Sequence, residues 1–437
     1  MPAAAASASG GGERPALGKR SALVVFLPGG PQQAGPSESD TIESELASIP
    51  TLSTGILSAT QGAYKVDQLL LDITQGARVS YSAYSPAYPP SLSSLTLGPG
   101  PSAHVSAWSA AVERAANAPQ LLDPGLLAAS IPGGAAYAAP YGVGAARLSG
   151  LSTANLAGTA TSSAALAANR RGEIAAVSFG SPATLLARIA TLRAGHRLVV
   201  ADLPPGRAGY TDLRALATIR PSGELLSVIQ SPPDTPGHEL LWSAFAGLSP
   251  EHGTGVSGRR TLTSTTTNQR GLIAAIDIGP TILTHLGLPI PADMRGKPVR
   301  LDGTFDGATL RALKARLVVI DSRRLPALEW LVLAWIVLLA AAQLPFGRSG
   351  GDAQPSSGDR LHGSEQPSVH RDGSARSSSG REAQRRHTAW ALRTGALAVL
   401  WTPVAVLVPA ALEPDRTTEF ALIVAICFAL GTLTDRL

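Results

Sequence analysis

Short apolar runs alternate with amphipathic stretches through the middle of the chain. Residues 174–179, 197–203 and 224–230 are predicted strands, because each is a short, largely apolar run bounded by polar or turn-forming residues. Between them, 183–194 and 210–217 repeat apolar positions at the three- and four-residue spacing typical of helices. This alternation predicts an α/β fold with a mostly parallel sheet covered by helices on both faces.

The segment 271–299 gives the most detailed local prediction. The run 272–276 is a predicted buried strand, and Asp277 follows where its carboxylate can accept backbone N–H groups at the start of a helix. Pro280 suits the first turn of that helix, and Gly287 suits its left-handed end. The apolar residues of the helix fall on one face: Ile278, Ile282, Leu283 and Leu286.

The same segment resembles the alkaline phosphatase superfamily, in particular cofactor-independent phosphoglycerate mutases and sulfatase-like hydrolases. The shared pattern is D-[IL]-x-P-T-[IL]-L, then L-G-L, P and M-x-G-K. The matching residues are Asp277, Pro280, Thr281, Ile282, Leu283, Leu286, Gly287, Leu288, Pro291, Met294, Gly296 and Lys297. The resemblance implies an alkaline phosphatase-like fold, in which this helix is scaffold and the metal ligands lie elsewhere. Residues 49–78 also resemble a segment of uncharacterised actinobacterial multi-pass membrane proteins.

Composition narrows the class of protein. A chain with 44% apolar and 15% charged residues favours a membrane protein over a typical soluble one. The net charge is +5, but the basic residues are dispersed and no nucleic-acid-binding motif is present, which excludes nucleic acid as an expected partner. The single cysteine, Cys427, rules out an intrachain disulfide and a cysteine-based zinc site.

Candidate nucleophiles lie between residues 49 and 60, which read as a Ser/Thr/Gly-rich loop before a predicted helix. The resemblance implies a Ser or Thr nucleophile in such a loop, and Thr51 and Thr54 are the candidates carried forward, with Ser53, Ser58 and Thr60 left open. The alternative is turn and cap chemistry, because a hydroxyl without a neighbouring base or metal is a poor nucleophile.

Ligands in parallel sheets gather at the carboxyl ends of strands. The loop after the strand 197–203 offers Asp202, and the one after 224–230 offers Asp234 and His238 in an Asp-x-x-x-His spacing, with His252 further on. Phosphoglycerate mutases carry a similar spacing in a metal site, and this ligand mixture suits manganese or zinc. The alternative is that Asp234 caps a turn and His238 opens a helix.

The first predicted strand, 23–27, carries no acid at its end. The resemblance implies a metal-binding aspartate there, but the sequence continues Leu27, Pro28, Gly29, Gly30. Three ligands from one region hold one ion at most, whereas a two-metal hydrolase needs ligands on several strand ends. No cofactor is therefore expected, and Mn or Zn is expected only for an enzyme.

Three apolar runs, 327–346, 390–412 and 420–433, are predicted transmembrane helices, which makes the lipid membrane an expected partner. The intervening 347–388 is a predicted disordered basic loop with seven arginines. The positive-inside rule then predicts a multi-pass protein of the cell membrane with an extracytoplasmic N-terminal domain. No export signal is visible, so either the natural start lies upstream, which we favour, or the N-terminal domain is cytoplasmic.

The predicted organisation is a flexible N-terminus, 1–20, and an α/β domain, 21–324, with an irregular insertion at 80–163. Within the insertion, helices are predicted around 105–118 and 124–130. The polar loop 261–270 is expected to be solvated, although Arg270 could contact an anionic group. The favoured hypothesis is a non-catalytic alkaline phosphatase-like domain with a binding or organising role at the cell envelope. The alternative is a metal-dependent hydrolase or transferase acting on phosphate or sulfate esters.

Overall fold

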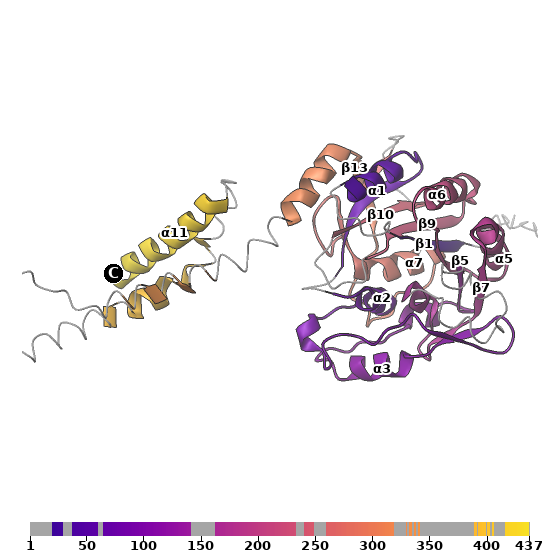
Figure 1. The fold of residues 1–437 in the computed structure, drawn as a ribbon, viewed down its shortest axis with the longest axis horizontal. Coiled ribbons are helices and arrows are strands. Elements are labelled where there is room, and N and C mark those ends of the chain that lie inside the picture. The colour runs from indigo at the N-terminus through magenta and orange to yellow at the C-terminus, as the bar shows by residue number, and fades with distance from the viewer. Residues whose placement is uncertain are drawn as a thin grey trace, which may run out of the picture. The chain divides into compact units, whose positions relative to one another are not determined.

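The computed structural model describes residues 20–28, 37–59, 64–140, 162–232, 240–248 and 259–318, with parts of 329–340, 389–405 and 416–436. The chain divides into two compact units, Met1–Val318 and Val319–Leu437. The first holds the α/β fold and is described first (Figure 1).

An eight-stranded sheet forms the centre of the first unit, in the order β12-β2-β10-β9-β1-β8-β5-β7. Only β10 runs antiparallel to its neighbours. The mostly parallel α/β sheet predicted from the sequence is confirmed. Its strands are β1 (Ser21–Leu27), β2 (Ser53–Ser58), β5 (Ala135–Pro140), β7 (Ala176–Gly180), β8 (Leu198–Asp202), β9 (Glu224–Gln230), β10 (Leu240–Ala246) and β12 (Leu272–Ala274).

Strand β1 lies inside the sheet, between β8 and β9, and is apolar on both faces. Val24 and Phe26 belong to one hydrophobic cluster, and Leu23 and Val25 belong to the other. Because successive side chains of a strand point to opposite faces, a continuous apolar run is the pattern expected for a strand covered by helices on both sides.

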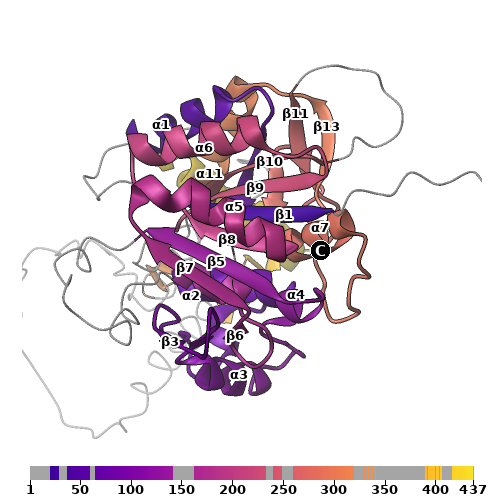
Figure 2. The same ribbon diagram turned by 90° about the vertical axis from the view of Figure 1, so that its right-hand side faces the viewer.

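Helices cover both faces of the sheet. The face that includes Leu23 packs against α1 (Ser37–Ala47), α5 (Leu185–Gly195), α6 (Arg207–Ile219) and the helix 307–318. Figure 2 shows α1, α5 and α6 together on this face. The other face packs against α2 (Val66–Gln75), α3 (Trp108–Ala116), α4 (Leu126–Ala129), α7 (Ile278–Leu286) and the short helix η4 (Ser162–Ala167).

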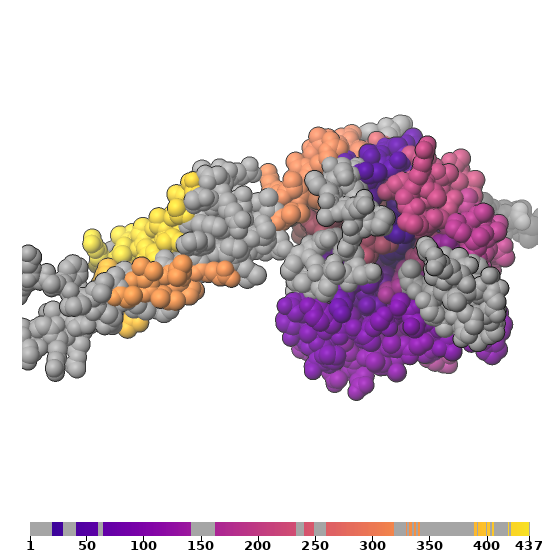
Figure 3. All heavy atoms as spheres, viewed as in Figure 1, coloured from indigo at the N-terminus to yellow at the C-terminus, as the bar shows by residue number. Residues whose placement is uncertain are grey.

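Residues 80–163, expected to be an irregular insertion with helices around 105–118 and 124–130, contain both helices and also strands that the sequence did not indicate. They supply α3, α4 and the sheet strand β5, and β3 (Leu95–Leu97) and β4 (Ala103–Val105) form a small sheet with β6 (Glu173–Ile174). The sequence did not predict β5, because its run AAYAAP lacks the β-branched residues that are typical of strands. The segment around α3, in purple, forms one end of the unit in Figure 3.

The predicted strand, turn and helix of 271–299 are confirmed. Strand β12 ends at Ala274, a short turn η6 (Ala275–Asp277) follows, and α7 runs to Leu286. Gly287 then adopts φ 70°, the left-handed conformation that ends a helix. Beside this region β11 (Arg260–Thr263) and β13 (Arg300–Thr304) form a separate two-stranded sheet.

The predicted transmembrane part is wrong. Among the helices that the structure describes, none is both long enough and apolar enough to cross a membrane. The run 420–433 lies in α11 (Arg416–Arg436), but it gives only about 21 Å of apolar helix against a ~30 Å hydrocarbon core. Parts of the predicted spans 327–346 and 390–412 lie outside the described residues.

Two apolar residues of α11 make side-chain contacts within the second unit. Ile423 and Cys427 pack against Ala398 and Ala405 in a small hydrophobic cluster. Polar contacts accompany this packing, since Arg393 Nε lies 3.3 Å from Asp435 Oδ1 and Trp401 Nε1 donates to Thr434 Oγ1 at 3.0 Å. These contacts involve few of the apolar residues of the unit, since Leu400 is 70% and Leu433 is 55% exposed.

Candidate functional site

Strands β8, β1 and β9 end together at the carboxyl edge of the sheet. Phe26 of β1 lies beside Asp202 of β8, and Leu27 lies beside Gln230 of β9. This is the edge at which open α/β sheets bind ligands. Asp202 is buried there.

Two hydroxyl groups from distant parts of the chain bind the Asp202 carboxylate. Tyr137 of β5 donates its hydroxyl to Oδ2 at 2.5 Å, and Ser163 of η4 donates to Oδ1 at 2.5 Å. Hydrogen bonds to an ionised group are short and stronger than neutral ones. Both carboxylate oxygens therefore join β8 to its neighbours inside the protein.

A second carboxylate, Asp67 in the first turn of α2, is bound in the same way. Its Oδ1 accepts the backbone N–H of Leu92 at 2.8 Å and the hydroxyl of Ser162 at 2.7 Å. The consecutive residues Ser162 and Ser163 thus bind carboxylates of α2 and β8. This pair fixes η4 over the carboxyl edge of the sheet.

Asp277 is completely buried and also serves as an internal acceptor. Its Oδ2 accepts the N–H of Ala274 at 2.9 Å, and its Oδ1 accepts the N–H of Lys297 at 2.9 Å and the hydroxyl of Thr266 at 2.5 Å. The predicted acceptance of backbone N–H groups is confirmed. They come from the preceding strand and from residue 297, however, and the side chain makes no cap bond to α7.

The other residues of the superfamily-like pattern hold 294–299 in place. Thr281 donates its hydroxyl to the Asp277 carbonyl at 2.5 Å and accepts the N–H of Val299 at 2.8 Å. Gly296 lies so close to the preceding turn that a Cβ there would be 2.0 Å from the carbonyl oxygen of Ile276. Each of these contacts is structural, and each brings together parts of the same segment.

Of the two candidate nucleophiles, Thr54 lies in a strand and Thr51 lies in a turn. Residues 53–58 form β2, so the expected loop is replaced by a strand of the main sheet. Thr51 is exposed in the turn before β2 and Thr54 is fully buried near its start. Both lie toward the amino end of β2, away from the edge that carries Asp202. The structure does not bring them together with Asp202.

The three candidate metal ligands, Asp234, His238 and His252, lie outside the described residues. Within the described parts of the chain, no group of three or more His, Cys, Asp or Glu side chains could hold a metal.

A buried polar cluster that includes residues of α2 contains two groups whose pKa values are raised. Asp72 accepts hydrogen bonds from Gln68 at 2.7 Å and Gln75 at 3.2 Å, and burial raises the pKa of its carboxyl well above the ordinary value. Burial, reinforced by Asp72, also raises the pKa of Tyr84 to about 12. The Arg114 guanidinium lies 3.6 Å from the centre of the Tyr84 ring and completes this cluster.

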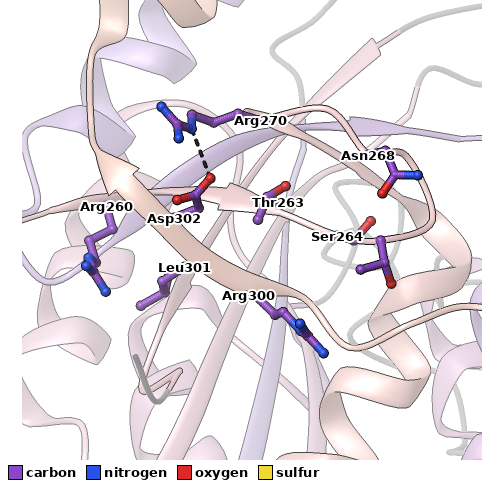
Figure 4. A pocket seen from close by; sticks show the side chains of 9 residues that line it. Arg260, Thr263, Ser264, Asn268, Arg270, Arg300, Leu301 and Asp302 are labelled. Atoms are coloured by element: carbon purple, nitrogen blue, oxygen red, sulfur yellow. Dashed lines mark hydrogen bonds and ion pairs between the residues drawn. The ribbon is translucent and has the colours of Figure 1, made fainter. Parts of the chain in front are cut away.

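An open pocket lies against β11 and β13, with a volume of about 610 Å³ (Figure 4). Its lining combines three arginines with hydroxyl and amide side chains: Arg260, Thr263, Ser264, Thr265, Asn268, Arg270, Arg300, Leu301 and Asp302. The sequence pointed only to Arg270. Arg260 and Arg300 are 40 residues apart along the chain, and antiparallel pairing of β11 with β13 brings them to one pocket.

Comparisons with known proteins give little guidance. No protein-family model matches the chain, and no significant match was found among curated proteins. The PH0037 protein from Pyrococcus horikoshii aligns with a TM-score of 0.30 and 10% identity, over 62% of this chain and 97% of that one. Ps i-CgsB aligns with a TM-score of 0.33 and 9% identity, over 67% and 76%. TM-scores this low do not establish a shared fold.

Proposed function

We propose that the α/β unit is a ligand-binding domain on an alkaline phosphatase-like scaffold that does not carry out metal-dependent ester hydrolysis. The observation that carries this proposal is the environment of Asp202. It is a carboxylate at the carboxyl edge of the central strands, and it uses both oxygens to accept internal hydroxyls from Tyr137 and Ser163. A hydrolytic metal site instead needs carboxylates that face an open coordination position.

The end of β1 supports the same proposal. The strand ends at Leu27 and Pro28 follows, so the described residues where the resemblance implies a metal-binding aspartate carry no acid. Asp67 and Asp277, the other buried carboxylates described above, also accept donors from within the fold. Together these contacts support carboxylates that stabilise the scaffold.

The alternative is a hydrolase that uses Asp234, His238 and His252. One observation favours it, because β9, the strand that precedes Asp234 and His238 in the sequence, ends beside β1 at the carboxyl edge. Manganese or zinc would be the expected metal under this alternative.

Turnover and metal content separate the two functions. Purified full-length protein is assayed with p-nitrophenyl phosphate and p-nitrophenyl sulfate in the presence of Mn²⁺ or Zn²⁺, and bound metal is measured by elemental analysis. We expect no turnover above buffer and no stoichiometric metal. Turnover that is lost in both Asp234→Asn and His238→Ala would overturn the proposal.

Stability measurements test the structural role of Asp202 directly. Tyr137→Phe and Ser163→Ala each remove one hydroxyl donor to a buried carboxylate, so each is expected to lower the free energy of unfolding by about 2 kcal/mol. Thr211→Val is the matched control, since its hydroxyl bonds only to a backbone carbonyl on the exposed surface of α6. Unfolding free energies of Tyr137→Phe and Ser163→Ala equal to that of the control would contradict a structural role for Asp202.

A further inference from the structure

The pocket against β11 and β13 is open, has the size of a small-molecule site and has a polar, basic lining. Its volume of about 610 Å³ falls within the range of ligand pockets, roughly 300–1,000 Å³. Figure 4 shows Arg260 and Arg300 on either side of Leu301, and Arg270 turned toward Asp302. The lining side chains include three guanidinium groups and one carboxylate, so positive charge predominates in them.

The loop that forms one wall is held in a defined shape. Asn268 has φ 50°, a left-handed conformation that non-glycine residues rarely adopt, and its N–H donates to the Ser264 carbonyl at 3.0 Å. Thr267 donates its hydroxyl to the Leu272 carbonyl at 2.6 Å, and Thr266 donates to Asp277. These bonds join the wall to the rigid turn before α7, so the pocket is built before any ligand arrives.

Arg270 is held across the hairpin by two contacts. Its Nε donates to Asp302 Oδ2 at 3.0 Å, and its guanidinium lies against Gly303, where an added Cβ would be 3.2 Å from Cζ. The Arg270 side chain is 61% exposed. An arginine has five N–H donors, and the bond to Asp302 engages only the one on Nε. The terminal nitrogens are therefore placed to meet an anionic oxygen from solvent.

The rest of the lining selects the kind of molecule that carries the anion. Hydroxyl and amide groups of Thr263, Ser264, Thr265 and Asn268 can both donate and accept hydrogen bonds, which suits a ligand rich in hydroxyl groups. Leu301 is the one aliphatic side chain in the lining, and no aromatic residue is present to stack on a base. These features disfavour a nucleobase or a lipid chain.

We propose that this pocket binds a small anionic carbohydrate, a sugar that carries a phosphate or a carboxylate group. The inference rests on the binding function proposed above and names its ligand class. The guanidinium groups recognise the anion, and the Thr, Ser and Asn side chains recognise the sugar hydroxyls.

Calorimetric titration of the full-length protein at low salt tests the proposal with four probes: glucose phosphate, glucuronate, inorganic phosphate and glucose. We expect at least one of the two sugar anions to bind, inorganic phosphate to bind more weakly than that sugar anion, and glucose not to bind. Comparison of glucose phosphate with glucuronate tells a phosphate ligand from a carboxylate ligand. Inorganic phosphate binding as tightly as both sugar anions would overturn recognition of the sugar.

Substitutions of two pocket arginines test whether the sugar anion binds in this pocket. Arg270→Gln and Arg300→Gln are each expected to weaken binding of the sugar anion at least tenfold. Arg171→Gln is the matched control, because Arg171 is also an exposed arginine paired with a carboxylate, Glu173, and lies outside the pocket. Thermal unfolding monitored by circular dichroism confirms that each variant is folded.

Two further results would overturn the inference: no binding of either sugar anion, or binding that Arg270→Gln and Arg300→Gln leave unchanged. These results are distinct from failure of the proposed function, which is measured as ester turnover. A protein without turnover and without sugar-anion binding would refute only the ligand class assigned to this pocket. A protein that turns over esters would refute the non-catalytic function whatever the titrations show.

Discussion

Thr54 presents a sharp test of the structure, because it is a buried threonine whose hydroxyl has no hydrogen-bond partner among the described residues. It lies in β2 opposite Ala244 of β10 and has no exposed surface. Replacement by valine keeps the branched shape and exchanges the hydroxyl for a methyl group. The variant should therefore be more stable than the natural protein.

The expected gain follows from the cost of the buried hydroxyl. A buried polar group without a partner costs about 1–3 kcal/mol, and an apolar group of the same shape removes that cost. We expect Thr54→Val to raise the free energy of unfolding by about 1.5 kcal/mol. With a denaturant slope of about 3 kcal/mol/M, the urea midpoint would rise by about 0.5 M.

Thr281→Val is the matched control, with the same chemical change at another buried threonine. The Thr281 hydroxyl donates to the Asp277 carbonyl and accepts from Val299 N–H, so valine removes both hydrogen bonds and leaves the buried Val299 N–H without this partner. The expected loss is about 3 kcal/mol, or about 1 M in urea midpoint. The same Thr→Val substitution should therefore raise the free energy of unfolding at residue 54 and lower it at residue 281.

Urea unfolding of the full-length variants, followed by circular dichroism, measures both effects. Destabilisation of Thr54→Val by 1 kcal/mol or more would show that its hydroxyl has a partner in the folded protein, and it would refute the reasoning. The same variant tests the nucleophile hypothesis. If any ester turnover is found, its survival in Thr54→Val excludes Thr54 as the nucleophile.

Two further predictions concern a buried acid and two glycines. Because the pKa of Asp72 is raised in the folded state, its contribution to stability is present below the unfolded pKa, near 3.8, and is lost as pH rises toward the folded pKa. Asp72→Asn should therefore gain stability relative to the natural protein between pH 4 and pH 8, roughly the range above that pKa. The urea midpoints of Asp72→Asn and the natural protein, measured at both pH values, test this prediction. Gly296→Ala should cost about 3 kcal/mol through its clash with Ile276, whereas Gly195→Ala, which meets no atom within 4 Å, should gain about 0.5–1 kcal/mol in α5.

Each of these two predictions has a result that would contradict it. A stability difference between Asp72→Asn and the natural protein that stays constant with pH would mean that the folded pKa of Asp72 is ordinary. Equal unfolding free energies for Gly296→Ala and Gly195→Ala would mean that 294–299 does not pack against the turn before α7. Thermal or urea unfolding is sufficient for both comparisons.

Much of the fold was predictable because it is encoded locally. The strand 224–230, the helix after Asp277 and the stop at Gly287 follow from apolar spacing and from the backbone preferences of single residues. Strand β5 was missed because of its alanine-rich composition. A Ser/Thr-rich run that was predicted to be a loop is strand β2 in the structure. Burial against neighbouring strands decides such segments, and that burial is not a local property.

The predicted membrane spans were wrong for a related reason. Hydropathy reports how apolar a segment is, but a helix can bury such residues against protein as well as in lipid. In α11 the apolar residues Ile423 and Cys427 pack against another part of the same unit, and the polar Asp435 pairs with Arg393. Hydropathy does not report which residues a segment contacts in the folded protein.

The sequence by itself determined the alternation of strands and helices and the local structure of 271–299, because these depend on residues a few positions apart. The tertiary structure alone decided that Asp202 binds hydroxyls of Tyr137 and Ser163, which lie 65 and 39 residues away. It also placed Arg260, Arg270 and Arg300 around one pocket. Strand order and register create such sites, because they fix which distant side chains share a face or an edge of a sheet.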